Sequence, residues 1–214
     1  MCFSAGASFT GSAILSVIGT LTLKKVSKPS QIVFASIPIF FAFQQFVEGV
    51  LWLVLPNTEY IAIEKAATYI FLVMAQVCWP LLIPISVLLM EESGKRRIIL
   101  YILLGIGIIV ALYYGCGLLF QHPHAQIKSY HIQYQAFTPT ASAITFFFLY
   151  LVAAVVPLFV LSTKKIYILG MLMLLSGVVT VIFFTQFVTS VWCFFAALMS
   201  VVIYYIIKSS KKTL

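Results

Sequence analysis

Glu48 is a carboxylic acid placed well inside an apolar segment, in the run FQQFVEGVLW at 43–52. The other acids lie at the edge of an apolar segment or between two of them: Glu59, Glu64, Glu91 and Glu92. A charge in hydrocarbon costs at least about 2.5 kcal/mol, so an intramembrane acid is by default a functional residue. Glu48 has the chemistry of a general base, a proton carrier or a metal ligand. The alternative is a structural acid that donates a hydrogen bond to a neighbouring helix.

Helical spacing places Gln44 and Glu48 on one stripe with Leu51 or Trp52, because residues three and four apart share a face. Gln45 joins Glu48 on the adjoining edge. At about 1.5 Å per residue, Glu48 lies about 12 Å below the nearer end of its segment. We therefore expect a polar pocket built on Glu48, Gln44 and Gln45 that opens toward that end.

Three further residues have side chains that bind metals or act in catalysis: Cys2, His131 and Cys193. Two thiolates, an imidazole and the Glu48 carboxylate would make a four-coordinate zinc site, or a three-ligand site with Glu48 as general base toward bound water. Removal of the initiator Met would also give Cys2 a free amine beside its thiol, a pair that chelates metals or acts as a nucleophile. A metal-free arrangement of Cys2, His131 and Glu48 and a Cys2–Cys193 disulfide are the alternatives.

Several other residues are predicted to line the pocket. Gln76 and Trp79 precede Pro80 and Pro84 at mid-depth of one segment, where the prolines free backbone carbonyls and favour a kink. The remaining predicted pocket residues are aromatic or carry a hydroxyl group. They lie at or near those ends of the apolar segments that we expect on the same side of the membrane as the end nearer Glu48: Trp52, Tyr134, Ser190 and Trp192.

The composition indicates the elements that must position these residues. With 63% hydrophobic and 8% charged residues and a mean hydropathy of +1.12, the chain is too apolar for a soluble domain. Its 214 residues suffice for seven helices of about 20 residues and leave no room for a separate soluble domain. The segments are continuously apolar rather than alternating, which favours helices over strands. We expect an all-α polytopic membrane protein, one seven-helix domain over 1–214, with spans at about 8–23, 32–55, 66–90, 98–120, 140–161, 166–185 and 191–207.

The net charge of +8 comes from thirteen Lys and Arg residues that all lie outside these segments. They gather mainly at 24–28, 95–97, 164–165 and 208–212, which are the first, third and fifth connections and the C-terminal tail. By the positive-inside rule this pattern predicts an external N-terminus and a cytoplasmic C-terminus, and it argues for an orientation signal rather than nucleic-acid binding. Cys2, His131, Cys193 and the end nearer Glu48 would then face outward.

Several short runs occur together in this chain: MCFSA at 1–5, QQFVEG at 44–49 with Trp52, CWP at 78–80, HIQY at 131–134 and SVWCFFAA at 190–197. In these runs the chain resembles an uncharacterised group of small bacterial seven-span membrane proteins that open with Met-Cys-Phe-Ser. The resemblance covers essentially the whole chain and supports the topology. It implies a multi-pass protein of the bacterial cytoplasmic (inner) membrane, and it supplies no reaction.

The leading hypothesis is a metal-dependent membrane enzyme, such as a zinc hydrolase of a lipid or small amphiphile. One alternative is a small solute or proton-coupled transporter in which Glu48 couples protons and Gln44 and Gln45 bind solute, with three spans on each side of a linker helix. A second is a binding or sensing protein without turnover. The expected partners are the lipid bilayer and a small-molecule or lipid substrate, and the sequence leaves the oligomeric state open.

Overall fold

The computed structural model describes residues 4–128, 130–135, 141–162 and 164–210. Within these residues, seven helices are long and apolar enough to cross a membrane, which confirms the predicted fold class. They are Ala5–Leu23, Pro29–Val54, Thr58–Met90, Gly94–Phe120, Ser142–Val160, Lys165–Phe183 and Val188–Ser210. The third begins at Thr58 rather than near residue 66, because the helix continues through the polar stretch that contains Glu59 and Glu64.

The first two helices form an antiparallel pair. α1 (Ala5–Leu23) begins after Ser4, whose hydroxyl accepts a hydrogen bond from the Ala7 N–H at 3.2 Å. It packs along α2 (Ile32–Val54), which follows a short 3-10 turn, η1 (Pro29–Gln31). Small polar residues let the two backbones approach closely, and the Ser12 hydroxyl donates to the Ala42 carbonyl at 2.8 Å. α2 thereby places its other face, which carries Glu48, toward the centre of the bundle.

The third span changes its winding at mid-depth. After η2 (Thr58–Tyr60), α3 (Ile61–Leu72) leads into a π-helical turn, η3 (Val73–Cys78), and α4 (Trp79–Met90) follows. In this turn the Trp79 N–H bonds to the Met74 carbonyl, five residues back. The same register sets the Ala75 carbonyl against Pro80, which has no N–H to donate. The Tyr150 hydroxyl, from another helix, donates to that carbonyl at 2.7 Å.

The fourth span contacts this altered region. α5 (Gly94–Phe120) packs against α4 and η3. At Gly107 an added Cβ would lie 2.1 Å from the Pro80 carbonyl oxygen, so the two backbones meet where only glycine fits. The Pro80 region is therefore contacted on one side by α5 and on another by Tyr150.

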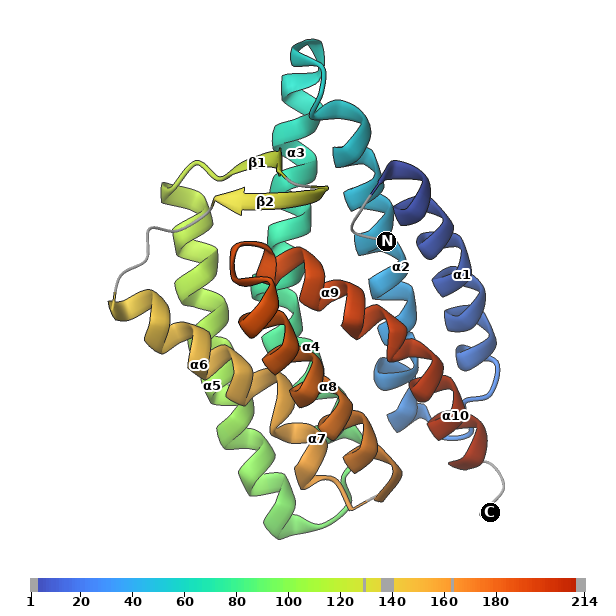
Figure 1. Ribbon diagram of the computed structural model, residues 1–214. Helices are drawn as coiled ribbons and strands as arrows, with labels where there is room; N and C mark the ends of the chain where they lie inside the picture. The colour runs from blue at the N-terminus through green and yellow to red at the C-terminus, as the bar shows by residue number, and fades with distance from the viewer. Residues whose placement is uncertain (1–3, 129, 136–140, 163, 211–214) are drawn as a thin grey trace.

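A β-hairpin covers one end of the bundle (Figure 1). It consists of β1 (His124–Lys128) and β2 (His131–Gln135), paired antiparallel with Lys128 opposite His131. Ala125 and Ile132 are buried in a cluster that also contains Leu51 of α2 and Cys193. The connection before the fifth span thus has regular structure that packs against α3, η4 (Thr185–Phe187) and α9 (Val188–Leu198), while the α2–α3 turn projects beyond it (Figure 1).

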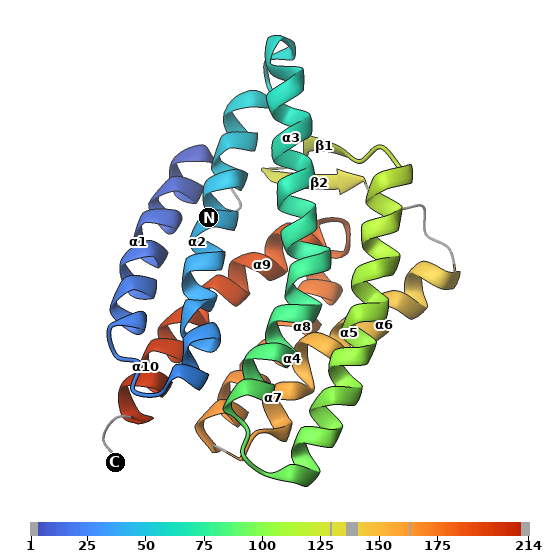
Figure 2. The same cartoon turned by 180° about the vertical axis from the view of Figure 1, so that it is seen from behind.

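The fifth and seventh spans are interrupted helices, and the sixth is continuous. α6 (Ala141–Val155) and α7 (Pro157–Val160) are separated at Val156, where Pro157 begins the new helix. After α8 (Lys164–Phe183) and η4 (Thr185–Phe187), α9 (Val188–Leu198) and α10 (Ser200–Ser210) are separated at Met199. α9 and α10 cross on the opposite side of the bundle from α3 and α5, which lie nearest the viewer in Figure 2.

The connections with basic clusters lie at the end opposite the hairpin (Figure 1). There Glu91, only 2% exposed, accepts hydrogen bonds from the Ser93 N–H at 2.9 Å and from the N–H and hydroxyl of Ser162 at 2.9–3.0 Å. Gln31 joins the same end through its amide N–H, which donates to the Ser210 hydroxyl at 2.9 Å. A polar pocket of about 290 Å³ lies among these residues. We call Gln31, Glu91, Ser93, Ser162 and Ser210 the basic-end cluster.

Candidate functional site

Two hydrogen bonds cross from α2 to α9 in the interior of the bundle. The Ser190 hydroxyl donates to Glu48 Oε1 at 2.5 Å, and the Gln44 amide donates to Cys193 Sγ at 3.1 Å. Gln44, Glu48 and Ser190 are fully buried, and Cys193 is 8% exposed. These contacts join residues more than 140 positions apart in the chain.

The spacing of the four residues explains why the contacts stack. Gln44 and Glu48 are four apart on α2, and Ser190 and Cys193 are three apart on α9, so each pair shares a helix face. The pairing is antiparallel, with the earlier residue of α2 bonded to the later residue of α9. We call these four residues the α2–α9 cluster.

Two neighbouring side chains orient the cluster. Gln45 donates from its amide to the second Glu48 oxygen, Oε2, at 3.2 Å. Trp79 donates from Nε1 to the Gln44 side-chain oxygen at 2.8 Å and stacks on Phe41 with ring centroids 4.1 Å apart. Each Glu48 oxygen therefore accepts a hydrogen bond. The Gln44 side-chain amide both accepts one, from Trp79, and donates one, to Cys193. Such bonds fix a buried polar group in one orientation.

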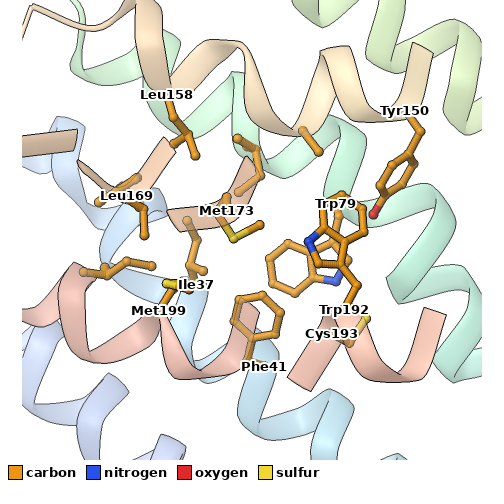
Figure 3. A pocket seen from close by; sticks show the side chains of 14 residues that line it. Ile37, Phe41, Trp79, Tyr150, Leu158, Leu169, Met173, Trp192, Cys193 and Met199 are labelled. Carbon is orange, nitrogen blue, oxygen red and sulfur yellow. The ribbon is translucent and has the colours of Figure 1, made fainter. Parts of the chain in front are cut away.

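An apolar cavity of about 40 Å³ lies beside the cluster (Figure 3). It is lined by residues of α2, α4, α6, α7, α8, α9 and α10, and Cys193 is among its wall residues. Its lining is aliphatic, aromatic and sulfur-containing: Phe34, Ile37, Phe41, Trp79, Ile83, Tyr150, Ala154, Leu158, Leu169, Met173, Trp192, Cys193, Met199 and Ile203. We call this space the tail cavity.

A second cavity of about 90 Å³ shares Tyr150, Trp192 and Cys193 with the tail cavity. Its other lining residues include polar ones: Ala75, Gln76, Tyr114, Phe147, Val188 and Thr189. Within the described residues, Gln76 Oε1 and Trp192 Nε1 are buried atoms without a hydrogen-bond partner. We call this space the head cavity; the two side chains that carry this free acceptor and this free donor both line it.

Comparison with known proteins identifies the family of this chain. The profile of a family of unknown function, DUF6629, matches residues 1–214. The chain belongs to the DUF6629 family. No curated protein and no solved structure matches the chain. The function of this DUF6629 member must therefore be argued from its own residues.

Of the predicted site residues, Glu48, Gln44, Gln45, Ser190 and Cys193 meet directly or through one another. Trp79 joins them through Gln44, and the head cavity takes in Gln76 and Trp192. The cluster is closed: no Glu48 surface is exposed, and the hairpin lies over the end at which we expected an opening.

His131 lies at the hairpin, against η4. Its ring packs on Phe187 with centroids 4.7 Å apart and on Phe184 at 5.7 Å. Burial lowers the pKa of His131, which favours the neutral imidazole that a metal ligand requires. In the described part of the chain, no group of three or more His, Cys, Asp or Glu residues is placed to hold a metal ion. Cys2 lies outside the described residues, so the four-ligand zinc site stays a prediction.

Tyr134 and Trp52 pack around the cluster rather than in it. Tyr134 stacks on Phe71 with centroids 4.5 Å apart, and Trp52 packs against the apolar group that contains Leu51. The Trp52 indole Nε1 is buried and has no hydrogen-bond partner among the residues described. Both residues support the hairpin end of the bundle.

The sequence reasoning missed Tyr150, Met173 and Met199 of the tail cavity. Tyr150 carried a signal, since a phenolic hydroxyl in the middle of a fifth span needs a partner. That partner is the Ala75 carbonyl left without an N–H by Pro80. The two methionines carried none, because Met is an ordinary residue of an apolar helix.

Proposed function

We propose that this DUF6629 member is an intramembrane hydrolase of a small amphiphile, with Glu48 as general base and Ser190 as nucleophile. The observation that carries the proposal is the hydrogen bond from the Ser190 hydroxyl to Glu48 at 2.5 Å. A nucleophile in contact with a base that a third group orients is the arrangement of covalent hydrolases. Gln45 is that third group, through its bond to the other Glu48 oxygen.

In the first step Glu48 accepts the Ser190 proton while Oγ forms a bond to an ester carbonyl carbon. The ester C–O bond breaks, and the proton passes from Glu48 to the departing alcohol. Water then attacks the acyl group on Ser190, giving its proton to Glu48, and the acid leaves as Ser190 takes that proton back. The overall reaction converts an ester and water to an acid and an alcohol.

Access to Ser190 requires movement, because its side chain is fully buried. Thr189 and Cys193, on either side of Ser190 in α9, line the head cavity. α9 is a short helix between η4 and the interruption at Met199. A substrate in the head cavity is thus separated from Ser190 by part of one helical turn, and a shift of α9 would admit it.

A metal-dependent form of this hydrolase would use Cys2, His131 and Cys193 as ligands of zinc or another divalent metal, with Glu48 as fourth ligand or base. The described residues alone do not provide this set of metal ligands. The steps above therefore use no metal ion. Metal analysis of the purified protein decides between the two forms. Near-stoichiometric zinc that is lost in Cys2→Ala and in His131→Ala would favour the metal-dependent form, and metal-free active protein would remove it.

The experiment is ester hydrolysis by the purified protein in lipid nanodiscs, with short-chain p-nitrophenyl esters. We expect Ser190→Ala and Glu48→Gln each to lower kcat by at least about 100-fold, the scale of a lost general base. Ser200→Ala is the matched control, because Ser200 is equally buried and its hydroxyl has no partner within the described residues. Unchanged hydrolysis by a folded Ser190→Ala variant, or no hydrolysis by the unaltered protein, would overturn the proposal.

A second candidate is a proton-coupled carrier in which Glu48 is the coupling group. It is supported by the interruptions at Val156 and Met199, since carriers often place their sites at broken helices. Uptake of a solute into proteoliposomes driven by a pH gradient would favour it if Glu48→Gln abolished the uptake. A Glu48→Gln change that altered stability alone would show that the acid is structural, and a binding or sensing protein without turnover would remain as the third possibility.

The proposed orientation places the hairpin outside and the basic end in the cytoplasm, with the bacterial inner membrane as the location. The support is that the basic clusters of the three connections and of α10 lie at one end of the bundle (Figure 1). In this orientation the α2–α9 cluster would be nearer the outer surface. A reporter fused to the C-terminus that is active only in the cytoplasm would test it.

A further inference from the structure

We infer that the tail and head cavities together bind one short single-chain amphiphile, with its alkyl chain in the tail cavity and an ester with a hydroxylated head in the head cavity. This inference names the substrate class of the proposed hydrolase and rests on that function only for the reaction. The binding site itself rests on the cavities and their unused polar atoms.

The tail cavity selects for a slim apolar chain. Its volume of about 40 Å³ is well below the roughly 150 Å³ of a cavity that takes up benzene, so as it stands it holds only about one or two methylene groups of a chain. A sterol ring system or two acyl chains would not fit this space. Met173 and Met199 stand in its wall and are unbranched, so they can yield to a longer chain. An apolar cavity of this kind stays dry when empty.

The head cavity selects for a group that both accepts and donates hydrogen bonds. Trp192, 8% exposed, offers an N–H, and Gln76 offers an amide oxygen, and neither atom has a partner among the described residues. A buried polar atom without a partner costs about 1–3 kcal/mol. An ester carbonyl that accepts from Trp192 and a hydroxyl that donates to Gln76 would remove both costs. A plain alkane would remove neither.

The junction of the two cavities is the point nearest to the reacting pair. Tyr150, Trp192 and Cys193 line both cavities, and Cys193 lies one turn along α9 from Ser190. A molecule with its chain in one cavity and its head in the other has its ester at this junction. The bond to be hydrolysed would then be the one nearest the Ser190 hydroxyl.

The test uses a glycerol monoester of an eight-carbon acid with a diazirine at the end of the chain, added to the protein in nanodiscs and irradiated. We expect cross-links to peptides that contain Met173 or Met199, removed by excess unmodified glycerol octanoate. Ala154→Phe should lower this labelling at least tenfold, because Ala154 is buried in the cavity wall. Ile144→Phe is the control on the same helix, since Ile144 is 58% exposed on the bundle surface.

The head contacts are tested by competition. In Trp192→Phe and Gln76→Leu, we expect glycerol octanoate to compete about tenfold less well, which corresponds to about 1.4 kcal/mol. In Gln76→Leu, competition by octane should stay unchanged, because octane uses the tail cavity and Gln76 lines only the head cavity. Equal loss for both competitors in this variant would show that it had disturbed the fold rather than the head site.

The site and the reaction can fail separately. Glu48→Gln should keep the labelling while it loses hydrolysis. Labelling that persists in Glu48→Gln together with no hydrolysis by the unaltered protein would keep the site and remove the hydrolase. Labelling spread over lipid-facing residues such as Ile144, or unaffected by Ala154→Phe, would overturn the site.

Discussion

Trp79 and Trp52 differ in what their indole N–H groups meet. Trp79 Nε1 donates to the buried Gln44 side chain, whose amide in turn holds Cys193. Trp52 Nε1 is also buried but has no hydrogen-bond partner in the part of the chain described. The two residues therefore separate the effect of one hydrogen bond from the effect of ring size.

We expect Trp79→Phe to lower the free energy of unfolding by about 1–3 kcal/mol more than Trp52→Phe does. Both changes remove the same atoms, but only the first leaves the Gln44 oxygen buried without its donor. Thermal or denaturant unfolding in one detergent measures the difference. Equal losses in the two variants would mean that the Trp79–Gln44 bond contributes nothing beyond packing.

The sequence identified the individual polar residues of the α2–α9 cluster but not all of their partners. Glu48 stood out because a carboxylate in an apolar segment must be accommodated, and the helical spacing tied Gln44 and Gln45 to it. The identity of its partner across the bundle was not in any local pattern. The contact between Glu48 and Ser190 joins residues 142 apart, and it depends on how α9 crosses α2.

The elements followed the hydrophobic pattern where that pattern was continuous. All seven spans were predicted, because a run of about 20 apolar residues has few stable forms in a bilayer. The hairpin was not predicted, since ten residues of mixed polarity specify a strand pair weakly. The prolines indicated a kink in the third span, but they did not indicate that it is a π-helical turn that Tyr150 completes.

The close packing of α5 on α4 gives a testable prediction. Gly107→Ala should destabilise the protein by about 1–3 kcal/mol, because the new Cβ would meet the Pro80 carbonyl, which is backbone and cannot rotate away. Gly105→Ala is the control on the same helix, since an added Cβ there meets no atom of the described structure within 4 Å. Its better helix propensity should leave stability unchanged or raise it by up to about 1 kcal/mol.

Unfolding of the two variants in the same detergent, with the unaltered protein as reference, gives the comparison. If Gly107→Ala were as stable as Gly105→Ala, the α4–α5 approach at Pro80 would be looser than the structure has it. The difference between the variants matters more than either value, because both changes add one methyl group to one helix.

Over the whole molecule, the two ends of the bundle are built differently. The hairpin end is closed by apolar contacts of Ala125 and Ile132, whereas the other end is held by the polar basic-end cluster. Through that cluster Glu91 joins the end of α4 to the connection after α7, and Gln31 joins the start of α2 to α10. A carrier would have to open this end, but a hydrolase with its site near the hairpin would not.

The basic-end cluster makes stability depend on pH. Burial alone would raise the pKa of Glu91, but hydrogen bonds from Ser93 and Ser162 and the charge of Arg96 outweigh it, and the pKa is lowered from its usual 4.5. A carboxylate with a lowered pKa in the folded state stabilises that state above its unfolded pKa, and the contribution is lost as pH falls through the folded value. We expect the melting temperature to fall as the pH drops below about 4.5, and Glu91→Gln to reduce that fall.

Glu92 is the matched control for this prediction. Its side chain is 86% exposed and pairs with Lys28 at 3.4 Å, an arrangement worth about 0–1 kcal/mol. At pH 7 Glu91→Gln should cost about 1–3 kcal/mol, since the neutral amide is a weaker acceptor for the Ser93 and Ser162 donors, whereas Glu92→Gln should cost less than about 1. Melting curves at pH 7 and at pH 3–4 for both variants supply the test. If acid lowered the melting temperature equally in Glu91→Gln and in the unaltered protein, the pH dependence would belong to other carboxylates. The hydrogen bonds that Glu91 accepts would then not stabilise the basic end.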